Sequence, residues 1–329
     1  MGSHSGHIHA PAWQNFIAEL GDPLLMPSDT VEALYGDSNA FIQKLLAKYD
    51  FPPPDASVTT EDITLDEGGV WVRIYTPPPP SKDTSASPNN NITVFMHGGG
   101  WIMGSVDHED SAVRGICKAV GHTIVSIGYR LAPKHKFPIA LEDCLRATLW
   151  TLDRFAATTD SVALLGGSAG ANLAFGVALR LLDAGLGGKF KGVVALVPCV
   201  VHPDAVPIVK RGMFTAYEEN AVMTTNTRAA MRCFLDSYGP PAGDVYFSVL
   251  LHPRIGELKK VYIVECGADT LRDDARLMRG ALEGTEVSLR YDAYAGLPHY
   301  FWAYPSKFLA ADSGAFHRNM FAAVEWVHE

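Results

Sequence analysis

The sequence lacks the features that mark several large classes of protein. No run of about 18 apolar residues occurs in the 329-residue chain, so no membrane-spanning helix is expected. There is no Gly-X-Y period and no self-similar repeat of about 20–50 residues, which excludes collagen-like and solenoid architectures. Lysine and arginine are scattered rather than clustered, so neither nucleic acid nor an anionic membrane is an expected partner.

Cysteine is scarce, and its spacing does not suggest a metal or redox site. The five cysteines are odd in number, widely spaced and without a C-x-x-C pair, which argues against a zinc site or a redox motif. Buried free thiols in a reducing compartment are expected for Cys117, Cys144, Cys199, Cys233 and Cys266. The N-terminus also lacks the apolar stretch of a secretory signal, so a cytoplasmic location is expected.

The first residues carry little information about the fold. The opening MGSH at residues 1–4 resembles an expression-tag remnant, and roughly the first ten residues are expected to be tag-derived or disordered. His4, His7 and His9 in this tail are not expected to bind a metal. No metal and no other cofactor is expected elsewhere.

The overall amino-acid composition is acidic and typical of a globular protein. Hydrophobic residues make up 47% of the chain and charged residues 19%, which excludes a disordered protein. Thirty-six acidic against 27 basic residues give a formal net charge of -9, which lowers the odds for a polyanionic partner. The length is compatible with two domains or with one long α/β domain.

Hydrophobic periodicity divides the chain into parts. Apolar residues recur at helical spacing over residues 12–50, which predicts helices there. Over residues 58–75 they recur with a period of two, with a turn at residues 67–69, which predicts a hairpin. After an exposed Pro/Ser/Asn-rich loop at 77–91, strands and helices alternate, which predicts a mainly parallel sheet with helices on both faces. The alternation breaks between about 198 and 243, where a helical insertion with aromatics is expected above the carboxyl ends of the strands. The strands are expected at 92–96, 123–127, 162–165, 193–197, 261–265 and 287–291, and the helices of this part at 138–155, 169–182 and 274–282.

A serine lies at one of the predicted strand–helix junctions. Residues 166–170 read GGSAG and match G-x-S-x-G between an apolar strand and a helix-forming run, which is the setting of a nucleophile elbow. The sharp turn strains the serine backbone, while the flanking glycines let neighbouring chain approach closely. An ordinary Gly/Ser-rich turn that holds a phosphate is the alternative. The context favours Ser168 as a nucleophile.

A second glycine-rich loop follows the strand at 92–96. His97 precedes Gly98, Gly99 and Gly100, whose backbone N–H groups are unobstructed and could bind a developing oxyanion together with that of Ala169. A flexible loop or a phosphate cradle is the alternative, although the Walker and dinucleotide-binding patterns are both absent.

A nucleophilic serine needs a base and an orienting carboxylate. His299 lies in a loop after the last predicted strand, and Asp269 follows the strand at 261–265, so both could reach the same rim of the sheet. The order Ser168, Asp269, His299 is the chain order of α/β-hydrolases. Structural roles are expected for three other histidines, His122, His202 and His252. The carboxylates of Asp273 and Asp274 are expected to begin a helix.

These motifs together resemble the carboxylesterases of the hormone-sensitive lipase family, over about residues 60–325. The resemblance rests on HGGGW at 97–101, YRLAPKHKFP at 129–138, the Ser168 elbow, DTLRD at 269–273 and Pro298-His299. It implies an α/β-hydrolase fold with Ser168 as nucleophile, His299 as general base and acid, and Asp269 as its orienting partner. It further implies that two of the three loop glycines, with Gly99 and Gly100 preferred, donate to the oxyanion.

The resemblance also implies a helical cap over the core. The expected cap consists of residues 1–55 and an insertion at about 200–243, and the core covers 56–329. The sequence departs from the family at Gly167, where the family usually has aspartate, and at Ala171, where it often has glycine. Neither change removes a catalytic group, and both bear on substrate preference and pH behaviour.

The expected function is hydrolysis of a small to medium apolar acyl ester through a Ser-His-Asp triad and an acyl-enzyme, without a cofactor. A lactonase, an amidase or an arylformamidase with the same triad is the alternative, as is a non-hydrolytic lyase or receptor on the same fold. The expected partner is a small-molecule ester, and a homodimer is left open. Five residues are expected to line a mainly apolar pocket, with cap or core packing as the alternative for each: Trp101, Met103, Phe214, Tyr217 and Trp302.

Overall fold

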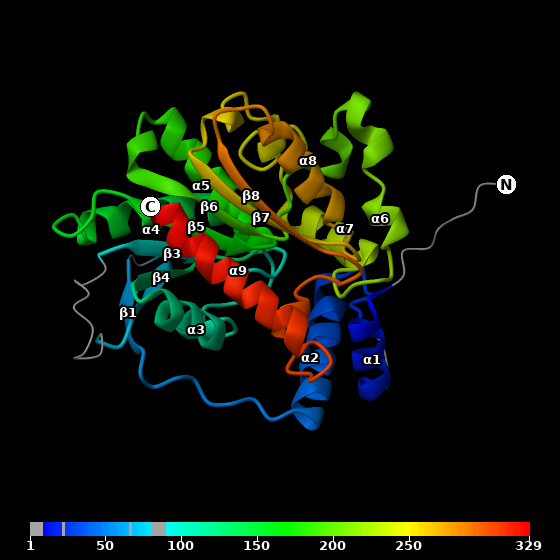
Figure 1. Ribbon diagram of the computed structural model, residues 1–329. Helices are drawn as coiled ribbons and strands as arrows, with labels where there is room; N and C mark the ends of the chain where they lie inside the picture. Colours follow the sequence, from blue (N-terminus) through cyan, green and yellow to red (C-terminus); the bar gives the residue numbers. More distant parts are fainter. Residues whose placement is uncertain (1–8, 22–23, 66–67, 80–89) are drawn as a thin grey trace.

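A computed structural model of the chain describes residues 9–21, 24–65, 68–79 and 90–329. Most of the expected tag remnant, with His4 and His7, lies outside the described residues, as do Glu67 of the predicted hairpin turn and most of the loop at 77–91. Figure 1 shows the arrangement of the elements along the chain.

One mainly parallel sheet forms the centre of the molecule. The described strands follow one another across it in the order β1-β2-β4-β3-β5-β6-β7-β8. β2 runs antiparallel to β1 and β4, and the remaining neighbours are parallel. The predicted fold class is therefore confirmed. The strands are β1 (Thr59–Thr64), β2 (Trp71–Thr76), β3 (Ile92–Met96), β4 (Thr123–Gly128), β5 (Val162–Gly167), β6 (Phe190–Leu196), β7 (Lys260–Cys266) and β8 (Ser288–Tyr294).

Helices cover both faces of this sheet. The α-helices are α1 (Pro11–Leu20), α2 (Val31–Lys48), α3 (Asp110–Val120), α4 (Ile139–Arg154), α5 (Ala169–Asp183), α6 (Ala216–Glu219), α7 (Arg228–Tyr238), α8 (Arg272–Leu282) and α9 (Ala310–His328). Short 3₁₀ turns are η1 (Gly187–Lys189), η2 (Pro203–Ala205), η3 (Ile208–Met213), η4 (Val249–Leu251), η5 (Ile255–Glu257) and η6 (Phe301–Ala303). None of the helices in the described part of the chain is long and apolar enough to cross a membrane.

The central strands supply both hydrophobic cores because successive side chains of a strand point to opposite faces. In β3, Val94 and Met96 belong to the core that also contains residues of α4, α5 and α8, whereas Phe95 belongs to the core that contains residues of α3 and α9. In β5, Leu164 and Leu165 divide between the two cores in the same way. Because both faces of these strands are buried, their sequences read as continuous apolar runs rather than as an alternation.

Two helices of the layer beside Phe95 do not appear among the predicted elements. α3 buries Val113, Ile116, Cys117 and Val120, which recur at i, i+3, i+4 and i+7, so its periodicity was present in the sequence. α9 is the helix at the C-terminal end of the described chain, and Figure 1 shows it crossing the sheet beside α3.

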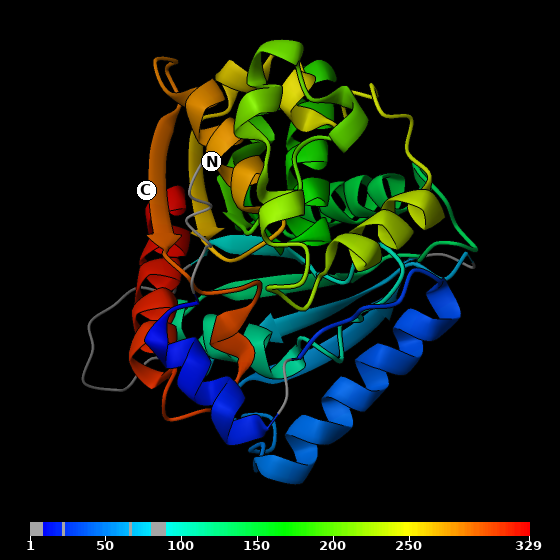
Figure 2. The same cartoon turned by 90° about the vertical axis from the view of Figure 1, so that its right-hand side faces the viewer.

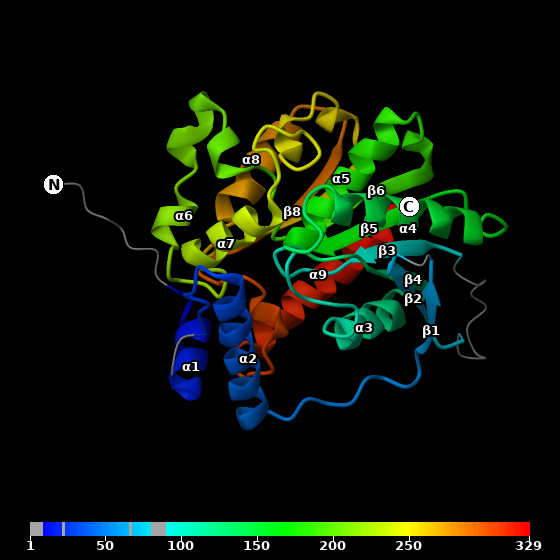
Figure 3. The same cartoon turned by 180° about the vertical axis from the view of Figure 1, so that it is seen from behind.

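The N-terminal helices and the insertion between β6 and β7 lie together. Met26 N–H donates to the Thr225 carbonyl (3.0 Å), the Thr227 hydroxyl donates back to the Met26 carbonyl, and α2 packs against α7. Figures 1 and 3 show α1, α2 and the segment with α6 and α7 on the same side of the molecule, away from the C-terminus, and this side faces the viewer in Figure 2. The division into a cap and a core at residue 55 stays a prediction.

Candidate active site

Ser168 lies on a sharp turn between β5 and α5. Its φ of 55° and ψ of −119° are outside the regions that non-glycine residues ordinarily occupy, and its backbone N–H donates to the Leu196 carbonyl of β6 (2.8 Å). A Cβ built on Gly170 would lie 2.0 Å from the Met96 carbonyl oxygen, and one on Gly166 would lie 2.3 Å from the Gly170 carbonyl carbon. The helix therefore begins so close to β3 and β5 that these two positions have no room for a side chain.

The loop after β3 fixes the direction of two backbone N–H groups. Burial lowers the pKa of His97 to about 4, so its ring is neutral, and Nδ1 lies 2.8 Å from the Gly98 carbonyl oxygen that accepts its hydrogen. The Gly99 carbonyl accepts hydrogen bonds from Ile102 N–H (3.2 Å) and Met103 N–H (2.9 Å). Because the N–H of a trans peptide points away from its C=O, the N–H groups of Gly99 and Gly100 face away from these bonds.

Gly98 differs from the two glycines that follow it. Its backbone faces the carboxyl group of Glu109, at the start of α3. Burial raises the pKa of that carboxyl group to about 7, and the Gly98 backbone opposes part of the rise. The geometry therefore leaves Gly99, Gly100 and Ala169 as the candidate oxyanion donors, since Ala169 lies in the first turn of α5, where N–H groups lack a partner within the helix.

Asp269 and His299 form a buried pair. Asp269 follows β7 and has no exposed surface, and His299 is 7% exposed in the loop after β8. The Asp269 Oδ2 atom lies 2.6 Å from His299 Nδ1. With the proton on Nδ1, this contact leaves the Nε2 lone pair of His299 free to accept a proton.

The insertion between β6 and β7 supplies further bonds to this pair. Asn226 Nδ2 donates to Asp269 Oδ1 (3.1 Å), which also accepts the Leu271 backbone N–H (3.0 Å). The Thr224 hydroxyl accepts the His299 backbone N–H (3.2 Å). Sequence reasoning missed both insertion residues. The signal was a polar run, residues 224–227, inside a segment that is otherwise rich in apolar side chains.

The side chain after His299 connects the base to both glycine loops. A Cβ on Gly167 would lie 1.9 Å from the Tyr300 Oη atom, and a Cβ on Gly98 would lie 2.8 Å from it. The loop that carries His299 therefore contacts the residue before Ser168 and the start of the oxyanion loop. Within the described residues no hydrogen bond joins the Ser168 hydroxyl to His299, and such bonds often tighten only when substrate is bound.

The five expected pocket residues lie in different surroundings. Trp101 is buried and stacks on Tyr238, with ring centroids 4.9 Å apart, which places it in the core. Met103, Phe214 and Tyr217 are partly buried against that same core. Trp302 lies on the opposite face of the sheet and stacks on Phe316. Their pocket role stays a prediction.

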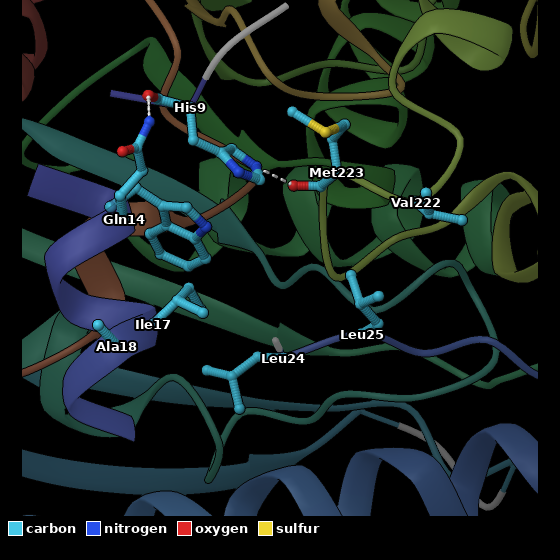
Figure 4. A pocket seen from close by; sticks show the side chains of 9 residues that line it. His9, Gln14, Ile17, Ala18, Leu24, Leu25, Val222 and Met223 are labelled. Atoms are coloured by element: carbon cyan, nitrogen blue, oxygen red, sulfur yellow. Dashed lines mark hydrogen bonds between the residues drawn. The ribbon is translucent and has the colours of Figure 1, made fainter. Parts of the chain in front are cut away.

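Two cavities lie near these segments. One, of about 360 Å³, lies between α1 and the insertion (Figure 4), and a hydrogen bond from His9 to the Met223 carbonyl (2.6 Å) spans it. Met223 directly precedes Thr224, so this cavity adjoins the segment that holds His299. The other, of about 330 Å³, lies between α3 and α9 and includes Gly167, Tyr300, Trp302 and Glu109 in its wall. Within the described chain, no group of three or more His, Cys, Asp or Glu side chains is arranged to hold a metal ion.

Comparisons with known proteins agree with this architecture. Residues 93–303 match a family model described as alpha/beta hydrolase fold. The chain is 60% identical over 302 residues to the FAD-linked oxidoreductase pytB of Aspergillus terreus, covering 92% of this chain but only 36% of that relative. It is 45% identical to the versiconal hemiacetal acetate esterase of Aspergillus parasiticus, covering 97% of this chain and 98% of the esterase. The crystal structure of vibralactone cyclase shares the fold, with a TM-score of 0.83 over 99% of this chain and 97% of that one, at 23% identity.

Proposed function

The chain belongs to the α/β-hydrolase fold family and is an ester-hydrolysing enzyme of the carboxylesterase type, and from that premise we propose that it works through an acyl-enzyme formed on Ser168. The observation that carries the proposal is the 2.6 Å contact between Asp269 and His299, in a loop that touches the strained turn of Ser168 through Tyr300. A merely structural histidine would need neither this carboxylate nor a position in a loop that contacts the residue before Ser168.

The proposed reaction has two stages. Ser168 Oγ attacks the ester carbonyl carbon while His299 Nε2 takes the serine proton, and the carbonyl oxygen becomes an oxyanion held by the N–H groups of Gly99, Gly100 and Ala169. The C–O bond to the alcohol then breaks, and His299 returns the proton to the leaving alkoxide. Water attacks the acyl-enzyme in the same manner, with His299 as base, and releases the acid and the free serine.

The proposed substrate is the acetate ester of a bulky, mainly apolar alcohol. The name of the 45% identical relative describes an acetate esterase. The leaving alcohol must lie beside His299, which protonates it, and the 360 Å³ cavity adjoins the Thr224 segment bonded to His299. Apolar side chains dominate the wall of that cavity, among them Trp13, Ile17, Leu24, Leu25 and Met223. A cavity of this size suits an aromatic or polycyclic alcohol.

The test compares esters that differ either in the alcohol group alone or in the acyl group alone. The protein is expected to hydrolyse naphthyl acetate faster than ethyl acetate, and naphthyl acetate faster than naphthyl octanoate. Ser168→Ala should lower kcat by a factor of at least about 10³, and mass spectrometry of acid-quenched wild type should find an acetyl group on the Ser168 peptide. Equal hydrolysis by Ser168→Ala would overturn the proposal. A matched ester, lactone and anilide would show whether a lactonase or an amidase describes the enzyme better.

A further inference from the structure

Tyr300 has an unusual backbone and an unusual set of neighbours. It follows His299 with a φ of 56°, in the left-handed region that favours glycine. Its hydroxyl lies where a side chain at Gly167 would have to be, because a Cβ there would be 1.9 Å from Oη and 2.8 Å from Cζ. A Cβ on Gly98 would meet the same hydroxyl at 2.8 Å. The tyrosine thus occupies the space that both glycines leave free.

These contacts link three segments whose relative positions must be correct for the proposed reaction. Gly167 precedes the nucleophile Ser168, Gly98 precedes the candidate oxyanion donors, and Tyr300 follows the base His299. The segments are far apart in sequence, so their relative positions depend on tertiary contacts. A displacement of about 1 Å between reacting groups can lower a rate by about 10².

The ring of Tyr300 borders a cavity. The 330 Å³ cavity has both Gly167 and Tyr300 in its wall. Trp302 lies beside the tyrosine, with ring centroids 4.9 Å apart, and is itself stacked on Phe316. A shorter side chain at position 300 would therefore enlarge the existing cavity beside the turn of Ser168.

We propose that Tyr300 is a positioning residue of this hydrolase, which holds the Ser168 turn and the oxyanion loop against the His299 loop and fills the space of the side chain that Gly167 lacks. The proposal rests on the proposed Ser168–His299 mechanism for its effect on rate. The contact between Tyr300 and Gly167 can be tested independently of that mechanism.

The first experiment separates positioning from binding. Tyr300→Leu removes the outer part of the ring, and kcat for naphthyl acetate is expected to fall by about 10–100-fold while KM changes less than about threefold. Tyr300→Phe removes the hydroxyl but keeps Cζ, the next atom to both glycines, so its loss of kcat should be clearly smaller than that of Tyr300→Leu. If Tyr300→Leu keeps the wild-type kcat, or if Phe is as damaging as Leu, Tyr300 does not position the site through its ring.

The second experiment measures the contact itself. Gly167→Ala should lower both kcat and the unfolding temperature in wild type, because its Cβ meets the Tyr300 hydroxyl, and should cost much less in the Tyr300→Leu background. Gly280→Ala on α8, where a Cβ meets nothing within 4 Å, is the matched control and should be tolerated in both backgrounds. Equal costs of Gly167→Ala in the two backgrounds would overturn the contact. The coupling in unfolding temperature persists even if Ser168→Ala proves fully active, so failure of the proposed function and failure of this inference give different results.

Discussion

Asn226 donates a 3.1 Å hydrogen bond from Nδ2 to Oδ1 of Asp269, across 43 residues of sequence. Asn226 is 3% exposed and Asp269 fully buried, so water does not readily replace this bond. The insertion between β6 and β7 is therefore attached to the acid of the proposed triad. Ordering of the insertion and orientation of His299 are physically connected through this contact.

Replacement of Asn226 should lower the rate without unfolding the protein. Asn226→Ala leaves Asp269 Oδ1 with the Leu271 N–H but without the amide, and kcat is expected to fall about tenfold, since a hydrogen bond to a charged group contributes about 1.5–3 kcal/mol. Asn226→Asp should cost more, because it places a second carboxylate beside Asp269. Steady-state kinetics checks both variants. Asn319→Ala on α9, which removes a long 3.4 Å bond to Tyr294, is the control, and a similar loss there would contradict the assignment.

Asp273 should anchor the start of α6. Its Oδ2 atom accepts the backbone N–H groups of Thr215 and Ala216, both at 2.7 Å, and its Oδ1 atom pairs with Arg272. Asp273→Ala removes this partner from two backbone N–H groups and from the buried Arg272, which keeps its ion pair with Glu219, so we expect a loss of about 2–3 kcal/mol in the free energy of unfolding.

The same variant should make the insertion more accessible. Limited proteolysis is expected to cleave Asp273→Ala between residues 203 and 219 faster than wild type. Asp204→Ala, on the same segment but with an exposed carboxylate, is the matched control. Equal cleavage of the three proteins would show that the carboxylate does not hold this segment.

Gly170 should be intolerant of any side chain. A Cβ there would lie 2.0 Å from the Met96 carbonyl oxygen, a backbone atom that cannot rotate away. Gly170→Ala is expected to lower the free energy of unfolding by about 3 kcal/mol and to reduce kcat, since α5 must shift and carries Ala169 with it. Gly36→Ala in α2 meets nothing within 4 Å and should be neutral or stabilising by up to about 1 kcal/mol. Urea unfolding of both variants checks the contrast.

Three buried histidines predict a loss of stability on mild acidification. Burial lowers the pKa of His97 and His122 to about 4, and burial with neighbouring positive groups lowers the pKa of His328 to about 3. Unfolded histidine titrates near 6.5, so the unfolded chain binds more protons between about pH 6.5 and 4. The free energy of unfolding therefore falls as pH drops through this window, by up to about 3 kcal/mol for each group. Glu109, whose pKa burial raises to about 7, opposes part of this effect.

His122 offers the cleanest variant for this measurement. Its Nε2 lies 2.9 Å from the Thr93 hydroxyl, which also contacts His328 Nε2 at 3.0 Å. His122→Gln should make urea unfolding less dependent on pH between about 6.5 and 4, whereas His108→Gln at an exposed site should not. An unchanged dependence in His122→Gln would show that this ring takes up its proton as readily in the folded protein as in the unfolded chain.

The fold was largely accessible from the sequence because its signals are local. The apolar runs of β3, β5, β6 and β7 and the helical spacing of α4, α5 and α8 each extend over a few residues, and they lie within a few residues of the predicted ranges. α3 was missed although its apolar spacing is regular. The insertion resisted prediction for a different reason: it forms short turns whose conformations depend on contacts such as those of Asp273.

By itself the sequence determined the two glycine loops, the candidate triad Ser168, Asp269 and His299, and the family to which they point. Strand–turn–helix geometry and steric room at glycine are properties of a few neighbouring residues, so a short motif is enough to specify them. Only the tertiary structure decided that Asn226 holds Asp269 and that Tyr300 fills the space beside Gly167. Those partners come from segments far apart in the chain, and packing between loops selects them.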